Sequence, residues 1–157
     1  MTRPGKVEVR VGTAADAVTF GRLLHEFNVE FDTDTPDPDV IAARAAPLID
    51  SGEMAVLFVG EAPDGFAQLR FRSSLYSAAR DTCLEELYVV PHRRGGGLGR
   101  ALLEAAMEHA RARGADHIEL NTSVADTAAV NLYESSGFTN REGGPNGPRM
   151  LYYERDL

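Results

Sequence analysis

The sequence predicts an α/β protein, a single domain over residues 1–157 built on a mixed sheet. We expect this sheet to be mostly antiparallel, with one central parallel pair and helices on both faces. Two apolar runs typical of strands, Met54–Gly60 and Phe66–Ser74, flank a tight turn and predict an antiparallel hairpin. A strand, a long amphipathic helix and another strand follow over residues 84–120, and such a unit joins two parallel strands by a right-handed crossover.

The composition fits one globular domain. The 157 residues are 43% apolar and 25% charged, and a chain of this length can bury a core. The net charge of −8 argues against nucleic acid as a partner and is compatible with a cationic substrate. A single cysteine indicates a reducing, cytoplasmic location. No run approaches ~20 apolar residues, so we expect no membrane partner. The four histidines lack metal-ligand spacing, so we expect no metal.

The first elements are a strand and a capped helix. Val7–Val11 alternates like a half-buried strand. Thr13 followed by Asp16 predicts a capping box, because each residue can bond the other's backbone N–H. The helix that it opens carries five apolar side chains: Val18, Leu23, Leu24, Phe27 and Phe31.

An acidic connection and a second helix come next. Residues 26–39 hold six carboxylates and neither Lys nor Arg; Asp32 and Asp34 lie in its middle. The run is either a solvated loop or one wall of a cleft for a cation. Asp37-Pro38 supplies an N-cap with proline at N1, which predicts a helix to about Ile49. The strand 66–74 then breaks strict alternation, which indicates a bulge.

The C-terminal third predicts two more helices and three more strands. The long helix buries one face (Leu98, Ala101, Leu102, Ala105 and Ala112). A strand through 118–120 follows, and then a short helix from 126 or 127 to Gly137. Phe138–Asn140 begins a strand and Arg149–Arg155 is expected to close the sheet. An exposed strand edge near the C-terminus would make a homodimer plausible.

The stretch over residues 84–103 is expected to bind a phosphate. It reads as a buried strand, a proline, four glycines within five residues and the start of a helix. Glycine allows positive φ and a close approach of the backbone to a ligand. The N-terminus of the helix adds unpaired N–H groups and partial positive charge, and three arginines add full charges: Arg93, Arg94 and Arg100.

The spacing decides which phosphate ligand is expected. A Walker A loop needs a lysine that is absent here, and the glycines do not fit the dinucleotide fingerprint. The pattern that fits is Val-x-Pro-x-x-Arg-x-x-Gly-x-Gly at Val89, Pro91, Arg94, Gly97 and Gly99. It closely resembles the acyl-CoA-binding motif of the GNAT superfamily of N-acetyltransferases. A second motif, Ala-x-x-x-Tyr-Glu-x-x-Gly-Phe over residues 129–138, resembles a helix of the same superfamily.

This resemblance implies the mixed α/β fold of that superfamily and acetyl-CoA as co-substrate. It implies that the strand segment 87–90 pairs with the pantetheine arm, through Leu87, Val89 and Val90. The residues implied for the phosphates are Arg94, Gly95, Gly97, Gly99 and Arg100. Asp126 stands where the family often has an asparagine that touches pantetheine, so this chain departs from the pattern there.

The resemblance also implies two catalytic groups. A tyrosine at the position of Tyr133 protonates the departing thiolate, and an acidic residue on the strand accepts the amine proton. The family places this base at the positions of Cys83 or Glu85, and only Glu85 is acidic. Glu86 would lie on the opposite face by strand periodicity, either solvated or facing the substrate. For substrate binding we expect Glu86 together with Asp32 and Asp34.

The function predicted from the sequence is an N-acetyltransferase. It would move the acetyl group of acetyl-CoA to a primary amine of a small cationic metabolite, polyamine-like or aminoglycoside-like, by direct attack in a ternary complex. A protein N-terminal or lysine acetyltransferase is the alternative enzyme, and a non-catalytic CoA-binding regulatory module is the alternative from another class. The plain alternatives for the residues are a core tyrosine at Tyr133 and a buried apolar Cys83.

Overall fold

The computed structural model describes residues 7–157 and divides the chain into two compact units. One runs up to Leu120 and the other is Asn121–Leu157. The expectation of one domain over 1–157 therefore stays a prediction.

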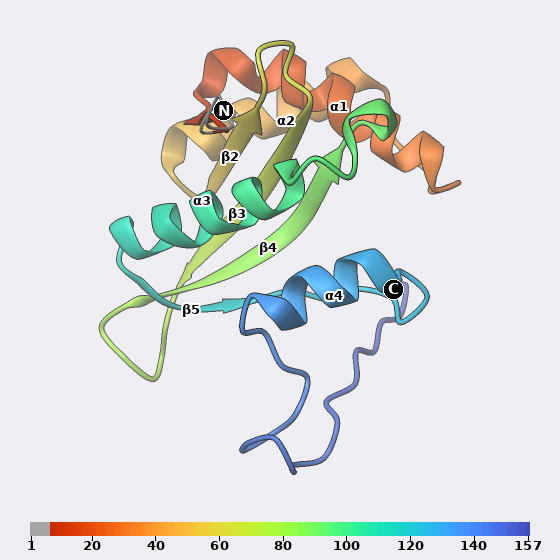
Figure 1. Cartoon of the computed structure of the whole chain (residues 1–157). Helices are drawn as coiled ribbons and strands as arrows, with labels where there is room; N and C mark the ends of the chain where they lie inside the picture. Colours follow the sequence, from red (N-terminus) through yellow and green to blue (C-terminus); the bar gives the residue numbers. More distant parts are fainter. Residues whose placement is uncertain (1–6) are drawn as a thin grey trace, which may run out of the picture. The chain divides into compact units, whose positions relative to one another are not determined.

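The unit up to Leu120 is built on a five-stranded mixed sheet (Figure 1). Its strands follow the order β1-β2-β3-β4-β5, and all neighbours are antiparallel except β4 and β5, which are parallel. The strands are β1 (Val9–Val11), β2 (Met54–Val59), β3 (Gly65–Ser73), β4 (Arg80–Val89) and β5 (Ala115–Glu119). The predicted α/β class, with an antiparallel majority and one parallel pair, is confirmed.

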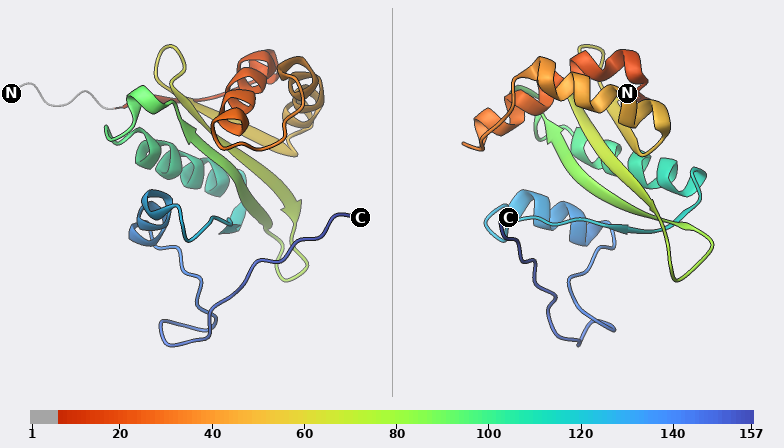
Figure 2. Two further views of the ribbon diagram at one scale, coloured as in Figure 1. Left: turned by 90° about the vertical axis from the view of Figure 1, so that its right-hand side faces the viewer. Right: turned by 180° about the vertical axis from the view of Figure 1, so that it is seen from behind.

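Helices cover both faces of this sheet (Figure 2). α1 (Ala17–Glu30) and α2 (Pro38–Ser51) share one core with the β2 to β4 side chains that face them. α3 (Leu98–Ala112) lies on the other face and forms the crossover connection between β4 and β5. This sandwiching is why every residue of β2 is buried, as expected for a strand covered on both sides.

Local signals place the helix starts as the sequence predicts. The Thr13 N–H donates to Asp16 Oδ2 at 2.8 Å, and a short 3₁₀ turn (Ala14–Asp16) leads into α1. Pro38 is the first residue of α2 and follows its N-cap, Asp37. The predicted apolar face of α1 is partly wrong, because Val18 and Phe31 are exposed.

α3 buries a face slightly different from the predicted one. Its buried residues are Leu98, Leu102, Leu103, Ala106 and Ala110, whereas Ala112 is exposed. The helix contacts all five strands of the sheet, so its contact stripe follows the twisted sheet instead of one straight row of small residues.

The sheet contains the expected bulge, and the extra residue is Glu85 of β4. Gln68 pairs with Glu86, but the next residue of β3, Leu69, pairs with Leu84. Glu85 therefore has no Cα partner on β3. A bulge of this kind turns the side chains of two consecutive residues toward the same face of the sheet.

β4 and β5 pair only at the beginning of β4. Their last partners are Cys83 and Glu119, whereas β4 continues to Val89. Between residues 84 and 89 the β5-facing edge of β4 therefore extends beyond its parallel neighbour. Such an edge can pair with an extended ligand through the backbone.

The unit Asn121–Leu157 contains one helix, α4 (Thr127–Ser135), followed by a glycine with φ 92° at Gly137. The predicted closing strand at 149–155 is wrong: the structure has only an isolated bridge between Arg141 and Arg149 there. A strand needs a partner to satisfy its backbone groups, and propensity alone does not supply one. Leu151 and Tyr153 are 70% and 82% exposed. The homodimer stays a prediction.

Candidate active site

The glycine loop is shaped to receive a ligand. Gly95 and Gly97 have φ of 81° and 83°, a conformation that favours glycine. Among the described residues, no atom lies within 4 Å of the place that a Cβ on either glycine would occupy. Packing does not require these glycines, so the open space in front of the loop is free for a ligand.

The loop leads into the N-terminus of α3. Ala101 donates the first helical hydrogen bond, to the Gly97 carbonyl at 3.0 Å. The N–H groups of Leu98 and Gly99 come before this bond, in the first turn, where an α-helix offers no acceptor to its N–H groups. Leu98 is buried and anchors the turn. The predicted phosphate ligands Gly95, Gly97, Gly99 and Arg100 thus lie in one short segment at a helix N-terminus, where anions bind.

The Arg94 side chain forms hydrogen bonds with β4 and with the end of α1. Its Nε donates to the Val89 carbonyl at 2.9 Å, and its Nη2 donates to both carboxylate oxygens of Glu30, at 3.0 and 2.7 Å. The guanidinium carbon lies 5.7 Å from the centre of the Tyr88 ring, and the Tyr88 hydroxyl bonds the same Glu30 at 3.4 Å. Arg94 therefore ties the glycine loop to the end of α1.

The edge of β4 that is predicted to pair with pantetheine already makes some hydrogen bonds within the protein. Leu87 and Val89 lie in the part of β4 beyond the pairing with β5. The Val89 carbonyl accepts from Arg94, and the Val90 N–H donates to the Asp64 carbonyl at 2.9 Å. A carbonyl can accept two hydrogen bonds, so Val89 still fits a strand-like ligand.

The bulge brings Glu85 and Glu86 together. Gln68 faces Glu86 directly across β3 and β4, so these two side chains share one face of the sheet. Gln68 Nε2 also donates to Glu85 Oε2 at 3.0 Å, which places Glu85 on that face as well. The expectation that Glu86 lies opposite Glu85 is wrong, because strict strand periodicity does not hold across a bulge.

The environment changes the acidity of one carboxyl of this pair. Glu86 is half-buried, whereas Glu85 is exposed. Burial, and to a smaller extent the neighbouring charge of Glu85, raise the pKa of Glu86 to about 7. A carboxyl with such a pKa can take up and release a proton near neutral pH, as a general base must.

Cys83 lies two residues earlier on the same strand, opposite Arg70. Burial and the charges of Glu85 and Glu119 raise the pKa of its thiol. A thiol with a raised pKa is a poor nucleophile, which favours the expectation that Cys83 is a small apolar residue.

Two carboxylates of the acidic run 26–39 form ion pairs, whereas two others are exposed on the loop between α1 and α2. Glu26 pairs with Arg22 at 3.0 Å and Glu30 with Arg94. Asp32 and Asp34 are exposed, and Asp32 has φ of 51°. Because these two lie on an exposed loop, the structure is compatible with a role in attracting cations.

Asp126 and Tyr133 belong to the C-terminal unit. The Asp126 side chain caps α4 by accepting from the Ala129 N–H at 3.0 Å. Tyr133 is half-buried, and its ring centre lies 5.8 Å from that of Phe138 in an edge-to-face arrangement. The motif Tyr-Glu-x-x-Gly-Phe thus has a packing role within this unit, in addition to the role predicted for the hydroxyl.

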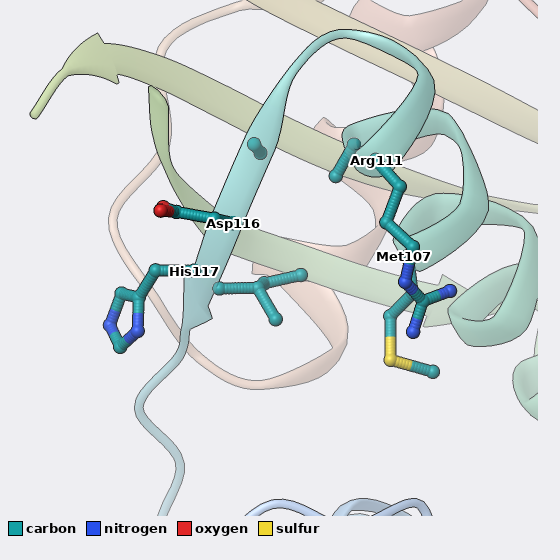
Figure 3. A pocket seen from close by; sticks show the side chains of 7 residues that line it. Met107, Arg111, Asp116 and His117 are labelled. Carbon is teal, nitrogen blue, oxygen red and sulfur yellow. The ribbon is translucent and has the colours of Figure 1, made fainter. Parts of the chain in front are cut away.

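A separate hollow of about 350 Å³ lies between α3 and β5. Met107 and Arg111 of α3 and Asp116 and His117 of β5 line it (Figure 3). None of the predicted site residues does, so we assign it no part in the site. Within residues 7–157, no three His, Cys, Asp or Glu side chains form a group that could hold a metal ion.

Sequence reasoning missed two residues of the site, Gln68 and Glu30. Gln68 is the one polar side chain in the apolar run 66–69 and is buried. A polar residue inside a buried strand is a signal that could have been used, because such a group needs a hydrogen-bond partner. Glu30 belongs to the acidic run 26–39, but no local signal predicts its pairing with Arg94, which is far away in the sequence.

A family model described as "Acetyltransferase (GNAT) family" matches residues 20–138. The match covers more than half of the chain, including both motifs and the glutamate pair. The chain therefore belongs to the GNAT acetyltransferase family, the class of acetyl-CoA-dependent N-acetyltransferases.

Individual relatives agree with this class. A crystal structure of a protein from Arthrobacter sp. FB24, named as an acetyltransferase, superposes with a TM-score of 0.90 at 42% identity and full coverage of both chains. The N-acetyltransferase YhfO of Bacillus subtilis is 30% identical over 87% of this chain and 93% of its own. Mycothiol acetyltransferase of Thermobispora bispora is 53% identical over 38% of this chain, but the match spans about a fifth (21%) of that relative.

A further relative is named for an aminoglycoside acceptor. The aminoglycoside N(6')-acetyltransferase type 1 of Klebsiella aerogenes is 36% identical over 54% of this chain and 60% of its own.

No helix among residues 7–157 is long and apolar enough to cross a membrane.

Proposed function

We propose that this protein transfers the acetyl group of acetyl-CoA to a primary amine of a small cationic molecule. The observation that carries the proposal is the pair Glu85 and Glu86 on one face of the sheet, next to the β4 edge that extends past β5. Two carboxyls can attract an ammonium group and remove its proton, which a module that only binds CoA does not need.

The residues proposed to hold acetyl-CoA fit that molecule. The N–H groups at the start of α3 and the left-handed glycines Gly95 and Gly97 suit its pyrophosphate. Leu87 and Val89 present a strand edge to the extended pantetheine arm. When bound, acetyl-CoA supplies an activated thioester carbonyl. The role of the protein is to bind acetyl-CoA, to orient it and to move protons.

Two kinds of group are proposed to move protons. An alkylamine has a pKa of about 10.4 and arrives protonated at pH 7, so it must lose a proton before its nitrogen can attack. The Glu85/Glu86 pair is proposed to accept this proton. The amine nitrogen then forms a bond to the acetyl carbon, the carbon–sulfur bond breaks, and Tyr133 is proposed to protonate the departing sulfur. The nitrogen loses its second proton as the amide forms, and this proton, passed on through solvent, restores the Tyr133 hydroxyl.

The charge of the chain supports a cationic acceptor. The net charge is −8, and the exposed carboxylates Asp32 and Asp34 lie on the loop after α1. The named acceptor of the Klebsiella aerogenes relative, an aminoglycoside, is a polycationic amine and supports the same substrate class.

A thiol-release assay with acetyl-CoA tests the proposal. The panel contains polyamines, aminoglycosides, peptides with a free N-terminus, a lysine peptide and buffer alone. We expect turnover above the buffer rate with one of the small cationic amines and a loss of about 10²-fold or more in a Glu85→Gln/Glu86→Gln variant. Turnover of peptides alone would favour a protein acetyltransferase. Acetyl-CoA binding without turnover on a broad amine panel would favour a regulatory module.

A further inference from the structure

Gln68 is held in one orientation within the sheet. It is 7% exposed, on β3, between strands that are both paired to it. Its Nε2 donates to Glu85 Oε2 at 3.0 Å and also contacts Met54 Sδ at 3.2 Å. A buried amide with fixed partners has little freedom to turn, so it fixes the position of the group that it bonds.

The group that it fixes is a bulge residue. Glu85 has no Cα partner on β3, and its side chain is exposed, so nothing in the strand pairing determines its direction. The bond to Gln68 brings this carboxylate back over the sheet. Glu86 lies directly opposite Gln68. One buried side chain therefore places a negative charge beside a half-buried carboxyl.

Other charged groups lie around this pair. On the same face, β3 carries Arg70 and Arg72, β4 carries Cys83, and β5 carries Glu119. Arg72 is already paired with Glu119 at 3.1 Å and with Asp81 at 3.5 Å. On α1, Glu26 is paired with Arg22 and Glu30 with Arg94. The charged residues of α2, Asp39, Arg44 and Asp50, are exposed.

From this arrangement we propose that Gln68 is a positioning residue: it holds the Glu85 carboxylate beside Glu86, so that Glu86 is the proton acceptor and Glu85 its fixed negative neighbour. This inference rests on the proposed function for the identity of the proton donor, an ammonium group. The placement of Glu85 by Gln68 can be measured without any turnover.

The test is a carboxyl ¹³C NMR titration of Glu86 in protein labelled with ¹³C-glutamate, with the resonance assigned from Glu86→Gln. Gln68→Met keeps a long side chain but removes the donor, so Glu85 should turn into solvent. We expect the midpoint of Glu86, which burial and Glu85 raise to about 7, to fall by roughly half a pH unit to one unit. Leu69→Met is the matched control, since this neighbour is also buried on β3 but faces the other side, and it should leave the midpoint unchanged.

A second variant separates positioning from a merely structural effect. Glu85→Gln alters an exposed residue and should lower the Glu86 midpoint by itself. In the Glu85→Gln background, Gln68→Met should then produce no further fall, because the charge that Gln68 positions is gone. An equal fall of the Glu86 midpoint in both backgrounds would overturn the proposal. An unmoved midpoint in Glu85→Gln would overturn it as well, and this second measurement does not depend on the folding of Gln68→Met.

The assignment of the acceptor has its own readout once a substrate is known from the amine panel. Glu86→Gln should remove the acidic limb of the kcat/KM profile, whereas Glu85→Gln should keep this limb and move it to lower pH. The reverse pattern would overturn the assignment of Glu86. Absence of turnover in the whole panel would refute the proposed function, while the titration would still decide whether Gln68 positions Glu85.

Discussion

Arg94 and Glu30 form an ion pair in which Arg94 Nη2 lies 2.7 Å from Glu30 Oε2 and 3.0 Å from Oε1. The pair joins the last residue of α1 to the loop that carries the cofactor motif. It also leads, on the α1 side, directly into the connection with Asp32 and Asp34. The element proposed to bind acetyl-CoA and the one proposed to attract the amine are thus linked by one contact.

This contact should be measurable in the stability of the free protein. We expect a double-mutant cycle with Glu30→Gln and Arg94→Gln to give a coupling free energy of unfolding of about 1 kcal/mol, at the upper end for exposed pairs, since Arg94 donates to both carboxylate oxygens of Glu30 at short distances. Urea denaturation of the four proteins measures it. Strictly additive effects would show that the pair does not hold the loop. The exposed pair Arg22–Glu26 on α1 is the control, with an expected coupling of about 0.3 kcal/mol.

Gly97 should matter for acetyl-CoA more than for folding. Gly97→Ala puts a Cβ into the space in front of the loop, so we expect acetyl-CoA binding to weaken by about 1–2 kcal/mol through lost charge-assisted hydrogen bonds. Calorimetric titration measures the loss. Gly114→Ala is the matched control: this glycine has φ of 86°, open surroundings and a place at the other end of α3. It should cost similar backbone strain and leave the affinity unchanged. Equal affinities in both variants would remove the loop as the phosphate site.

Tyr133→Phe should lower kcat by roughly 10²-fold with little change in acetyl-CoA affinity, because a general acid acts in the chemical step. The ring stays, so its edge-to-face contact with Phe138 is kept. Steady-state kinetics with the identified amine measures the effect. Tyr76→Phe, at a 99% exposed position, serves as the control and should leave kcat unchanged. Near-wild-type turnover of Tyr133→Phe would leave this residue with a packing role alone.

The raised pKa of Glu86 predicts a pH-dependent cost in stability. The pKa is about 7 in the folded protein and 4.5 for the model group, so the folded state binds the proton more tightly. The contribution of this group is therefore fully present below pH 4.5 and is lost as pH rises to about 7. Glu86→Gln avoids that loss. Allowing for solvent at this half-buried site, we expect it to be more stable than the wild type by about 1–2 kcal/mol at pH 8, with a smaller difference at pH 4.5.

Urea denaturation at both pH values checks this sign. Glu104→Gln, on the exposed face of α3, is the control and should show no such change with pH. A constant difference between Glu86→Gln and the wild type across the range would show that Glu86 ionises as easily in the folded as in the unfolded chain.

Asp32 and Asp34 should act at long range. Neutralising both as Asn should raise KM for a cationic amine about two- to fivefold at low salt and less at 0.5 M salt, where the Debye length is only a few ångströms. The control removes the same charge elsewhere, by Glu104→Gln and Glu108→Gln on α3. A KM that does not depend on salt or on these residues would leave the loop as a solvated connection.

The sequence by itself determined the elements that depend on neighbours in the chain. Asp37-Pro38 predicts the start of α2, and Gly97 marks the turn into α3, because capping and positive φ are properties of a few adjacent residues. The two motifs likewise predicted the family before any contact was known. These signals are short-range, so they survive without knowledge of the partner strands.

Only the tertiary structure decided which side chains meet. Strand periodicity alone places Glu85 and Glu86 on opposite faces, but pairing with β3 makes Glu85 a bulge and puts both beside Gln68. Tertiary structure also decides whether residues 149–155 form a strand. Their strand propensity is not enough to form one without a partner strand. Register and pairing depend on residues far apart in the chain, and for that reason the face that we propose for proton transfer could be found only in the fold.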